Sequence, residues 1–370
     1  MIRVLHCVST PAIWSGVMSV IMNYYRHLDR TFVQFDFLCF IHCENSYDSE
    51  ITSYGGHIYY VNKPGSSIAA MRELETFFKE HEGRYQWFHN HEVYLSFYLW
   101  RLASRYDLGH FAIHSHATRY SDRWLSARRN QILCYPILFM KCSRIACSRA
   151  AGSFLFGEKM VQRNKVFILY NAIDCKRYGY NQAKREELRK CLGVQDKLVI
   201  GHVGRFEKQK NHEFLIESFS IFKKQCPEGV LILIGNGSLK AAIEQKVKAA
   251  GLEEAVFFLG QQNNSQDWYQ AMDLYWLPSV YEGLPMSAVE AQASGLPCLL
   301  AETITREVVL LETTKLLSLK MGPEFWAKEA CKQHSAKKRG DAWRKVEEAG
   351  FGIEGASVVL QQYYMNEGAK

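Results

Sequence analysis

The sequence lacks several features that would place it in a narrow class at once. No apolar run reaches the roughly 18 residues that a membrane-spanning helix requires, and no low-complexity tract predicts disorder. The eleven cysteines contain no Cys-x-x-Cys pair. Their odd number and scatter are typical of a reduced cytoplasmic protein. The N-terminal string MIRVLHCVST has none of the parts of a signal peptide in series, so we expect a first strand there.

Length and patterning predict an α/β protein of two domains. The chain has 370 residues, of which 48% are hydrophobic and 22% charged, and a single core rarely grows to this size. Short apolar runs alternate with helical stretches such as 17–28 and 68–81, which predicts parallel sheets with helices on both faces. We expect seven strands in the first half and five in the second, with a polar break over 175–196. The expected domains are residues 1–174 and 175–350, followed by a helical segment at 351–370.

Much of the formal charge of +7 lies in one segment, residues 119–149. Its cations, set against the single acid Asp122, are Arg119, Arg123, Arg128, Arg129, Lys141, Arg144 and Arg149. Large apolar residues such as Trp124 and Ile132 lie among them. This segment is compatible with a helix on an anionic membrane surface and equally with an ordinary helix that has a solvated basic face. No nucleic-acid-binding module is recognisable, so nucleic acid is not expected as a partner.

The most informative stretch is PSVYEGLPMSAVEAQASGLPCLL, which follows a predicted strand at 274–277. Pro285 suits the first position of a helix, and Gly295 suits its end. Glu282 then falls in the loop, and Glu290 lies two turns along the helix. A helix N-terminus offers backbone N–H groups to a phosphate, and a carboxylate can accept hydrogen bonds from vicinal hydroxyls. The stretch therefore indicates a nucleotide-sugar site, although a capping or solvent-facing role would suit either glutamate alone.

A second motif, HVGRFEKQKNHEFLIESF, places two cations in the loop after a predicted strand that ends at Val203. Arg205 can clamp phosphate oxygens in a fork, and Lys210 can act as a point charge. Cations in this position can neutralise a diphosphate as it leaves. A solvated loop would explain this motif taken alone, but the two motifs together favour a site for a nucleotide-sugar.

Together the two strings resemble those of retaining glycosyltransferase family 4, whose members have the GT-B fold. The resemblance covers nearly the whole chain and includes the turns at 170–174 and 235–237, with Ala172 in place of the family's glycine. It implies two Rossmann-like, doubly wound domains that face a central cleft, with the last helix returning to the N-terminal domain. Members that build bacterial capsular or exported polysaccharide are the most similar.

The resemblance also implies a role for each motif residue. Arg205 and Lys210 hold the donor diphosphate, and Glu290 holds the ribose hydroxyls. Glu282 contacts the donor sugar and is assigned as catalytic. The implied donor-binding residues are Gly16, Arg205, Lys210, Gly283, Leu284 and Glu290.

The N-terminal domain is implied to bind the acceptor and to supply a catalytic histidine. In the string IHSHATRYSDR, His116 lies beyond a predicted strand end, where it can donate to a sugar hydroxyl and titrate near neutral pH. His114 is more typical of a core histidine. Gly16 occupies the second position of a glycine pair that lies near the donor phosphate in the family, whereas Ser15 departs from the first. A simple turn glycine explains Gly16 equally well.

The string His89-Asn90-His91-Glu92 raises the alternative of a metal site. It lacks a closing set of ligands at recognisable spacing. The chain also has no Asp-x-Asp, the metal-holding signature of the other large glycosyltransferase fold. We therefore expect no metal and no cofactor, with arginine and lysine supplying the positive charge.

Together with the motifs, the resemblance implies a metal-independent hexosyltransferase that acts in capsule or exopolysaccharide synthesis, and the resemblance alone implies that it acts with retention. The donor is expected to be a UDP-linked sugar, and the acceptor a lipid-linked or other saccharide. The expected location is the cytoplasm, at the inner face of the membrane if the basic segment binds lipid. Two alternatives stay open: a nucleotide-sugar epimerase of the same architecture, and a degenerate, non-catalytic binder of sugar nucleotides.

Overall fold

The computed structural model describes residues 1–121, 123–262, 264–333 and 339–367. Contacts within the chain divide it into two units. Unit 1 comprises Met1–Ala172 and the C-terminal segment from Ile353, and unit 2 comprises Ile173–Gly352. The chain thus passes between the units twice, at points close to residues 174 and 350, where the sequence suggests boundaries.

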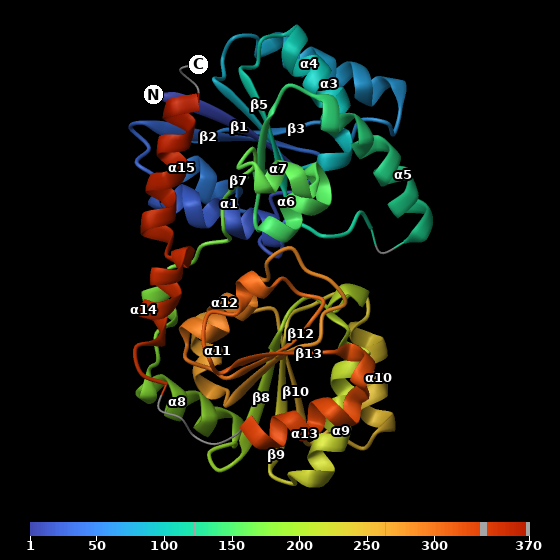
Figure 1. The fold of residues 1–370 in the computed structure, drawn as a ribbon, viewed down its shortest axis with the longest axis vertical. Coiled ribbons are helices and arrows are strands. Elements are labelled where there is room, and N and C mark those ends of the chain that lie inside the picture. The colour runs from blue at the N-terminus through green and yellow to red at the C-terminus, as the bar shows by residue number, and fades with distance from the viewer. Residues whose placement is uncertain (122, 263, 334–338, 368–370) are drawn as a thin grey trace. The chain divides into compact units, whose positions relative to one another are not determined.

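Unit 1 is built on a sheet of seven parallel strands in the order β3-β2-β1-β4-β5-β6-β7 (Figure 1). The strands are β1 (Ile2–Val8), β2 (Val33–Cys39), β3 (Ile58–Tyr60), β4 (Trp87–Asn90), β5 (His110–Ser115), β6 (Ser143–Ala146) and β7 (Phe167–Ile168). All seven strands predicted for this half are present. β2 is buried along its whole length, because helices cover both faces of a parallel sheet.

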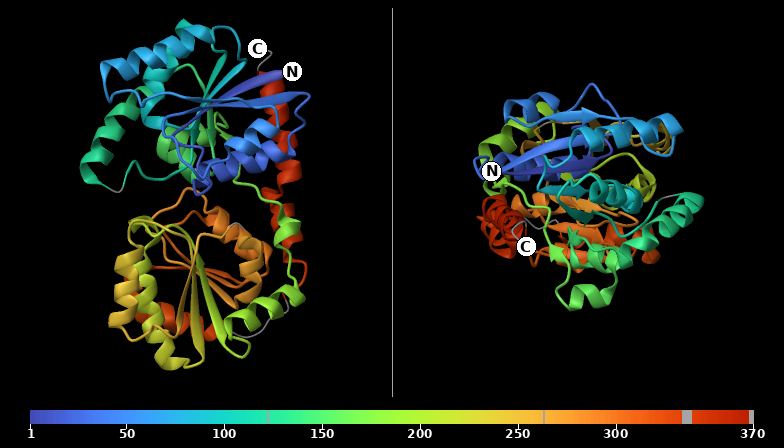
Figure 2. Two further views of the ribbon diagram at one scale, coloured as in Figure 1. Left: turned by 180° about the vertical axis from the view of Figure 1, so that it is seen from behind. Right: turned by 90° about the horizontal axis from the view of Figure 1, so that it is seen from above.

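Helices lie on both faces of the unit 1 sheet (Figures 1 and 2). They are α1 (Gly16–His27), α2 (Asp48–Ser53), α3 (Ile68–Glu80), α4 (Ser96–Arg105), α5 (Trp124–Cys134), α6 (Arg149–Phe156), α7 (Glu158–Gln162) and α15 (Ile353–Glu367), with 3-10 turns η1 (Val93–Leu95) and η2 (Tyr135–Phe139). α4 packs against α3 and α5, and α1 packs against α15. Ser15, Ser67 and Ser148 begin α1, α3 and α6, because each hydroxyl accepts a hydrogen bond from a first-turn N–H.

Unit 2 is built on a sheet of six parallel strands in the order β10-β9-β8-β11-β12-β13. The strands are β8 (Leu198–Val203), β9 (Gly229–Ile234), β10 (Val256–Gly260), β11 (Leu274–Leu277), β12 (Cys298–Ala301) and β13 (Thr314–Leu317). Strands β8 to β12 confirm the five strands predicted for this half of the sequence. β13 is not predicted from the sequence, because it is a four-residue edge strand whose two inner residues are only half-buried.

The helices of unit 2 also form two layers. They are α8 (Gln182–Leu192), α9 (His212–Gln225), α10 (Lys240–Ala249), α11 (Ser265–Ala271), α12 (Met286–Ala293), α13 (Gly322–Gln333) and α14 (Ala342–Val346), with short turns η3 (Cys175–Tyr178), η4 (Lys208–Lys210), η5 (Arg306–Val308), η6 (Leu319–Met321) and η7 (Glu347–Phe351). α9 packs against α10 and α13, whereas α11 packs against α8 and α12. Across the described residues of both units, no helix combines the length and apolar character needed to cross a bilayer.

Both sheets have the strand order of a doubly wound fold, which reverses beside the first strand. The reversal lies between β1 and β4 in unit 1 and between β8 and β11 in unit 2. Ligands of such folds bind outside the carboxyl ends of the strands at this reversal. The topology therefore brings the loops after β8 and β11, which carry the two motif strings, to the same edge of the unit 2 sheet.

The final helix, α15, packs on unit 1. Trp87 Nε1 donates to the Tyr364 carbonyl oxygen at 3.1 Å, and the Asp29 N–H donates to Gln361 Oε1 at 3.2 Å. The Tyr364 side chain is fully buried. The expectation that the last helix returns to the N-terminal domain is therefore confirmed.

Asp273, just before β11, ties α8 to the sheet of unit 2. Its carboxylate pairs with Arg185 and, at 3.0 Å, with Arg189, and it accepts the Val199 N–H at 2.8 Å. Burial raises the pKa of Asp273, but the Arg185 charge and the Val199 hydrogen bond outweigh burial. They hold that pKa below its ordinary value of 3.8.

Replacing Asp273 by alanine should leave two largely buried guanidinium groups without their counter-ion. We expect the free energy of unfolding, measured by urea denaturation at neutral pH, to fall by about 3–5 kcal/mol. The folded-state pKa of Asp273 is depressed, so the difference from the wild type should be complete above about pH 5 and shrink as the pH falls through the acid range. The control Glu187→Gln breaks the more exposed pair with Lys184 on α8 and should cost at most about 1 kcal/mol. Equal losses in the two variants would contradict the prediction.

Candidate active site

The loop after β8 carries both predicted cations. β8 ends at Val203, Gly204 turns the chain, and Arg205 follows with an exposed side chain. The turn η4 then places Lys210 just before α9, with a mostly buried side chain. Arg205 is therefore presented to solvent and Lys210 to the protein, and both follow the carboxyl end of an inner strand of the sheet.

Two glycines after β9 let their loop pack closely on the loop that carries Arg205. Gly235 has a φ of 138°, and a side chain there would collide with the Gly204 backbone. A Cβ on Gly237 would approach the Phe206 backbone to 2.6–2.8 Å. The Phe206 N–H donates at 3.0 Å to the carbonyl oxygen between the two glycines. This Gly-Asn-Gly string therefore supports the loop that presents Arg205.

The loop after β11 brings Glu282 to Lys210. Lys210 Nζ donates to Glu282 Oε1 at 2.7 Å, and Gln209 Nε2 donates to Oε2 at 3.1 Å. The Val280 N–H also donates to the Gln209 carbonyl oxygen at 2.8 Å, so backbone and side chains together join the two loops. Gln209 is not among the residues predicted from the sequence, because a glutamine in a polar loop carries no pattern of its own.

Gly283 and Leu284 connect Glu282 to the N-terminus of α12. Pro285 has a ψ of 115° and stands just before the first helical residue. The expectation that it occupies the first helical position is therefore wrong by one residue, since its extended backbone caps the helix. Gly295 follows the helix with a φ of 72°, which confirms the predicted end. Glu282 thus precedes, by three residues in the chain, the cap of α12, whose first turn exposes N–H groups.

Glu290, on α12, is buried inside unit 2. Its Oε2 accepts a hydrogen bond from the Tyr269 hydroxyl at 2.8 Å, and its Oε1 accepts one from the Tyr178 hydroxyl at 3.1 Å. Burial raises the pKa of Glu290, against the lowering effect of these two hydrogen bonds. Sequence reasoning misses both tyrosines, because Tyr178 lies 112 residues from Glu290 and no local pattern links them.

Unit 1 places His116 directly after β5, as predicted, and joins it to a second histidine. His91 Nδ1 and His116 Nε2 are 2.8 Å apart. Burial lowers the pKa of His116 to about 3. The expectation that His116 titrates near neutral pH is therefore wrong, and its imidazole is uncharged there. His114 is buried on β5, which confirms it as a core histidine.

Gly16 is the exposed first residue of α1, after β1. A Cβ added to it would meet no atom within 4 Å. The Ser15 hydroxyl caps the helix by accepting the Met18 N–H at 3.4 Å. The space around this position therefore does not require a glycine, and Gly16 itself is exposed, whereas Met18 of the same turn is buried.

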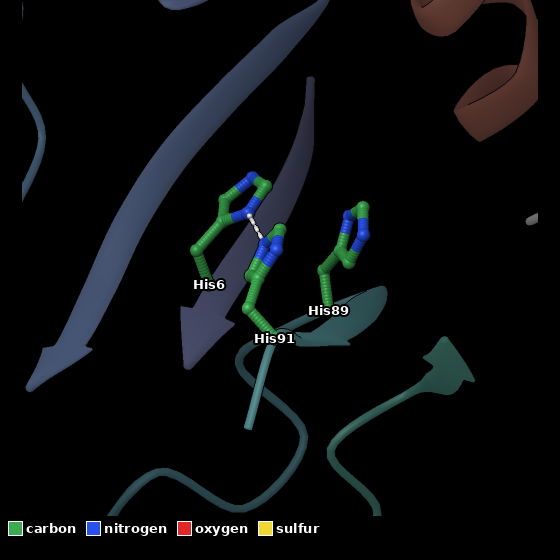
Figure 3. A group of neighbouring side chains, drawn as sticks. All are labelled: His6, His89 and His91. Carbon is green, nitrogen blue, oxygen red and sulfur yellow. Dashed lines mark hydrogen bonds between the residues drawn. The ribbon is translucent and has the colours of Figure 1, made fainter. Parts of the chain in front are cut away.

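Histidines gather at the carboxyl end of the unit 1 sheet, and two groups of three have ligand atoms within 4.8 Å of one another. The groups are His6, His89 and His91 (Figure 3), and His91, His114 and His116. The rings in the first group are tilted by 14–29° from one another, and those in the second by 26–37°. A metal ion lies in the plane of each imidazole that binds it, at about 2.0–2.1 Å. In this structure the facing nitrogens of His6 and His91, and of His91 and His116, lie 3.0 and 2.8 Å apart, which is hydrogen-bonding distance. The expectation that the site holds no metal stays a prediction.

The basic segment forms α5, η2 and β6, and many of its apolar side chains are exposed. Those of α5 and η2 that are 41–76% exposed are Trp124, Leu125, Ile132, Leu133, Tyr135, Leu138 and Phe139. Arg128 lies between Trp124 and Ile132 at a spacing of four residues, so all three share one helix face. Arg129 is exposed beside them and donates to the neighbouring Asn130 side chain. We call this mixed apolar and cationic area the α5 surface.

Comparison with known proteins places this arrangement in a family. The family described as "Glycosyl transferases group 1" matches residues 184–317. The chain is 34% identical over 340 residues to "Putative glycosyltransferase EpsF" of Bacillus subtilis (strain 168), a match that covers 90% of this chain and 88% of that protein. It is 28% identical over 148 residues to the UDP-Gal:alpha-D-GlcNAc-diphosphoundecaprenol alpha-1,3-galactosyltransferase of Escherichia coli, covering 39% of this chain and 38% of that one.

The fold is similar to that of HepE from Anabaena, solved in complex with UDP-glucose. The TM-score is 0.78 at 18% identity, and the match covers 99% of each chain. The expected GT-B architecture of two Rossmann-like domains with parallel sheets is therefore confirmed. With the motif strings on facing loops of unit 2 and the likeness to EpsF along nearly its whole length, the chain belongs to the family of group 1 glycosyl transferases.

Proposed function

We propose that the protein transfers a hexosyl group from a UDP-linked donor to a lipid-linked saccharide during capsule or exopolysaccharide synthesis. The observation that carries the proposal is the meeting of the Lys210 and Glu282 loops at the strand-order reversal of unit 2. Three relatives support it. EpsF is named as a glycosyltransferase, the Escherichia coli relative uses UDP-Gal and a diphosphoundecaprenol-linked acceptor, and HepE has been solved with UDP-glucose.

The cations of the β8 loop suit the departing diphosphate. As the bond from the anomeric carbon to the diphosphate oxygen breaks, its electron pair stays on the diphosphate. The acceptor hydroxyl oxygen bonds to the same carbon, and its proton passes to an oxygen of the departing diphosphate. Arg205 is exposed and can fork onto two phosphate oxygens, Lys210 adds a second positive charge, and α12 contributes backbone N–H groups after Leu284. Preorganised charge of this kind stabilises the transition state, and in this proposal it takes the place of a metal ion.

Glu282 is proposed to bind hydroxyls of the donor sugar. Lys210 and Gln209 each engage one of its oxygens, which orients the carboxylate beside the diphosphate site. An ionised carboxylate has about four lone-pair sites, so a carboxylate held in this way also accepts hydrogen bonds from a sugar. Lys210 then has two tasks, to attract the diphosphate and to position Glu282.

Glu290 is proposed to bind the two ribose hydroxyls of the donor nucleotide. A buried carboxylate is costly unless it is hydrogen-bonded, and the Tyr269 and Tyr178 hydroxyls supply one hydrogen bond to each oxygen. The same two bonds fix the direction of its remaining lone pairs. This preorganisation is what recognition of a vicinal diol requires.

Unit 1 is proposed to bind the acceptor and, through Gly16 and His116, to contact the donor. The assignment follows from the family 4 resemblance, which also implies retention of the anomeric configuration. Because burial keeps the His116 imidazole uncharged, we assign it a hydrogen bond to the sugar and no electrostatic role.

The α5 surface is proposed to rest on the anionic inner face of the membrane. A merely solvated basic helix would keep its large apolar residues covered, whereas here they are exposed by 41–76%. Burying such a side chain contributes about 1.5–3 kcal/mol, and each nearby cation contributes about 1 kcal/mol at an anionic surface. Contact with lipid explains why exposed apolar side chains and arginines occur together on this surface. It would also place the enzyme beside a lipid-linked acceptor.

Two other activities are compatible with this architecture and predict different products. An epimerase would change the sugar and leave the nucleotide attached to it. A non-catalytic binder would hold UDP without turnover on any acceptor. Release of UDP that depends on the acceptor is the property that separates a transferase from both.

Lys210→Ala should lower kcat/KM for transfer by about 10²–10³-fold, because it removes positive charge from the diphosphate site and the ion pair that positions Glu282. The measurement is UDP release from UDP-glucose and UDP-galactose with a diphosphoundecaprenol-linked sugar as acceptor. Lys208→Ala changes an exposed cation of the same loop and should stay within about twofold of the wild type. Wild-type rates in Lys210→Ala would remove the assignment.

Glu290→Gln should weaken UDP binding by about 10–100-fold, since hydrogen bonds to a charged group contribute about 1.5–3 kcal/mol. The variant and the wild type should bind 2′,3′-dideoxy-UDP alike, because that ligand lacks the hydroxyls assigned to Glu290. Titration calorimetry with both ligands measures the difference, and Glu213→Gln on the surface of α9 serves as the control. If both ligands weaken equally, the glutamate acts through the folding of unit 2 and the ribose assignment fails.

Trp124→Ser combined with Ile132→Ser should reduce binding to phosphatidylglycerol-containing vesicles by at least about tenfold, because two apolar side chains are lost from the contact. Cosedimentation measures the bound fraction, and salt should weaken wild-type binding by screening the arginines. Ile68→Ser, at a position of α3 that is 71% exposed, should bind like the wild type. Wild-type protein that stays in the supernatant with anionic vesicles would refute the membrane proposal.

A further inference from the structure

Two short hydrogen-bonded chains of rings run side by side at the carboxyl end of the unit 1 sheet. The first chain, with nitrogen separations of 3.0 and 2.8 Å, is His6–His91–His116. The second, with separations of 2.6 and 3.2 Å, is Tyr364–His89–His114. Bonded imidazoles meet edge to edge, tilted by 21–26° with centroids 5.1–5.3 Å apart. Three pairs of imidazoles from different chains stack with centroids 3.9–4.9 Å apart, and the His91 and His114 rings are tilted by 37°. Figure 3 shows His89 beside the bonded pair His6 and His91.

Few arrangements of protons are possible in the hydrogen-bonded rings His6–His91–His116. A neutral imidazole has one N–H donor and one acceptor nitrogen. Burial lowers the pKa of His6 and of His116 to about 3, and that of His91 well below its ordinary value, so each ring carries one proton at neutral pH. Because each bond needs one donor and one acceptor, only two arrangements are consistent. All three protons are on Nδ1, or all three are on Nε2.

The environment of His6, the ring farthest from His116, decides between the two arrangements. His6 Nε2 is buried and has no hydrogen-bond partner among the described residues. With the protons on Nε2, this atom would be a buried N–H donor without an acceptor. With the protons on Nδ1, it would be an acceptor without a donor, and unsatisfied buried acceptors are tolerated more often than unsatisfied N–H groups. The unpartnered His6 Nε2 therefore favours the arrangement in which His6, His91 and His116 each carry their proton on Nδ1.

We infer that His6 and His91 hold His116 in its Nδ1–H tautomer, so that His116 presents a hydrogen-bond donor to the reacting sugar and does not act as a base. This inference rests on the proposed function for what His116 contacts, but not for its tautomer. His91 donates its Nδ1–H to His116 Nε2 and so occupies the lone pair that would otherwise accept a proton. His6 and His91 are positioning residues, and the proton of the acceptor hydroxyl leaves to a group other than His116.

Nitrogen NMR of the full chain reads the tautomer directly. In protein labelled with ¹⁵N-histidine, two-bond proton–nitrogen correlations distinguish a protonated ring nitrogen from a bare one. The His116 signals are assigned by their absence from His116→Gln. We expect Nδ1 of His116 to be protonated and Nε2 bare. The opposite pattern in the wild-type protein would overturn the inference, whatever reaction the protein catalyses.

Two variants of His91 test its positioning role. His91→Asn keeps an amide N–H near the Nδ1 position, so His116 should keep its tautomer and transfer should be largely retained. His91→Leu removes the donor, so His116 should return to the Nε2–H form that free histidine favours, with kcat lowered by about tenfold or more. An unchanged His116 tautomer in His91→Leu would overturn the role of His91.

A third variant separates this effect from the cost of losing any buried histidine. His81 is buried in the same unit but is not among the clustered histidines, and its Nδ1 lies 2.8 Å from the Phe77 carbonyl oxygen. His81→Leu should leave the His116 tautomer unchanged even if it lowers the thermal stability as much as His91→Leu does. If His81→Leu shifts the tautomer too, the chain of rings does not set it. A wild-type protein that transfers no sugar would refute the proposed function, while the tautomer measurement would still decide this inference.

Discussion

The parallel direction of the strands is the constraint on which the whole site depends. In a parallel sheet every carboxyl end lies at one edge, and right-handed connections send the helices on the two sides of the first strand to opposite faces. The loops after β8 and β11 therefore meet although a long stretch of chain separates them. The ion pair between Lys210 and Glu282 then joins the two loops at 2.7 Å. Without that topology the motif residues would be isolated surface charges.

Charged side chains of the candidate site in unit 2 differ in burial and therefore in the partners they can contact. Arg205 is exposed and available to a ligand, whereas Lys210 is mostly buried and already engaged with Glu282. Glu290 is buried too, but it meets tyrosine hydroxyls, and its pKa is raised by burial. In the proposed site, one cation would recognise the diphosphate from solvent while the other positions Glu282. A buried carboxylate with oriented lone pairs suits a diol better than a mobile one does.

The histidine cluster of unit 1 consists of uncharged side chains whose positions are fixed by hydrogen bonds. Its clustered histidines are uncharged because burial lowers their pKa values, so they interact through directed hydrogen bonds and ring stacking. Tyr364 of α15 bonds to His89, which ties the final helix to the same cluster. On the α5 surface, by contrast, the exposed Arg128 and Arg129 lie among exposed apolar side chains. The unit therefore combines a cluster of uncharged, hydrogen-bonded histidines with the surface that we propose rests on an anionic bilayer.

The sequence alone predicted seven strands in the first half and five in the second, and it placed Arg205, Lys210, Glu282 and His116 in loops that follow strands. It could do so because hydrophobic periodicity, glycine and proline are local signals. It did not reveal β13, a short edge strand that pairs only across the sheet. It also missed Gln209, Tyr178 and Tyr269, and it assigned His116 a titration near neutral pH. Only the tertiary structure decided hydrogen-bond partners and protonation, because burial and electrostatic neighbours depend on distances through space between segments that are far apart in the chain.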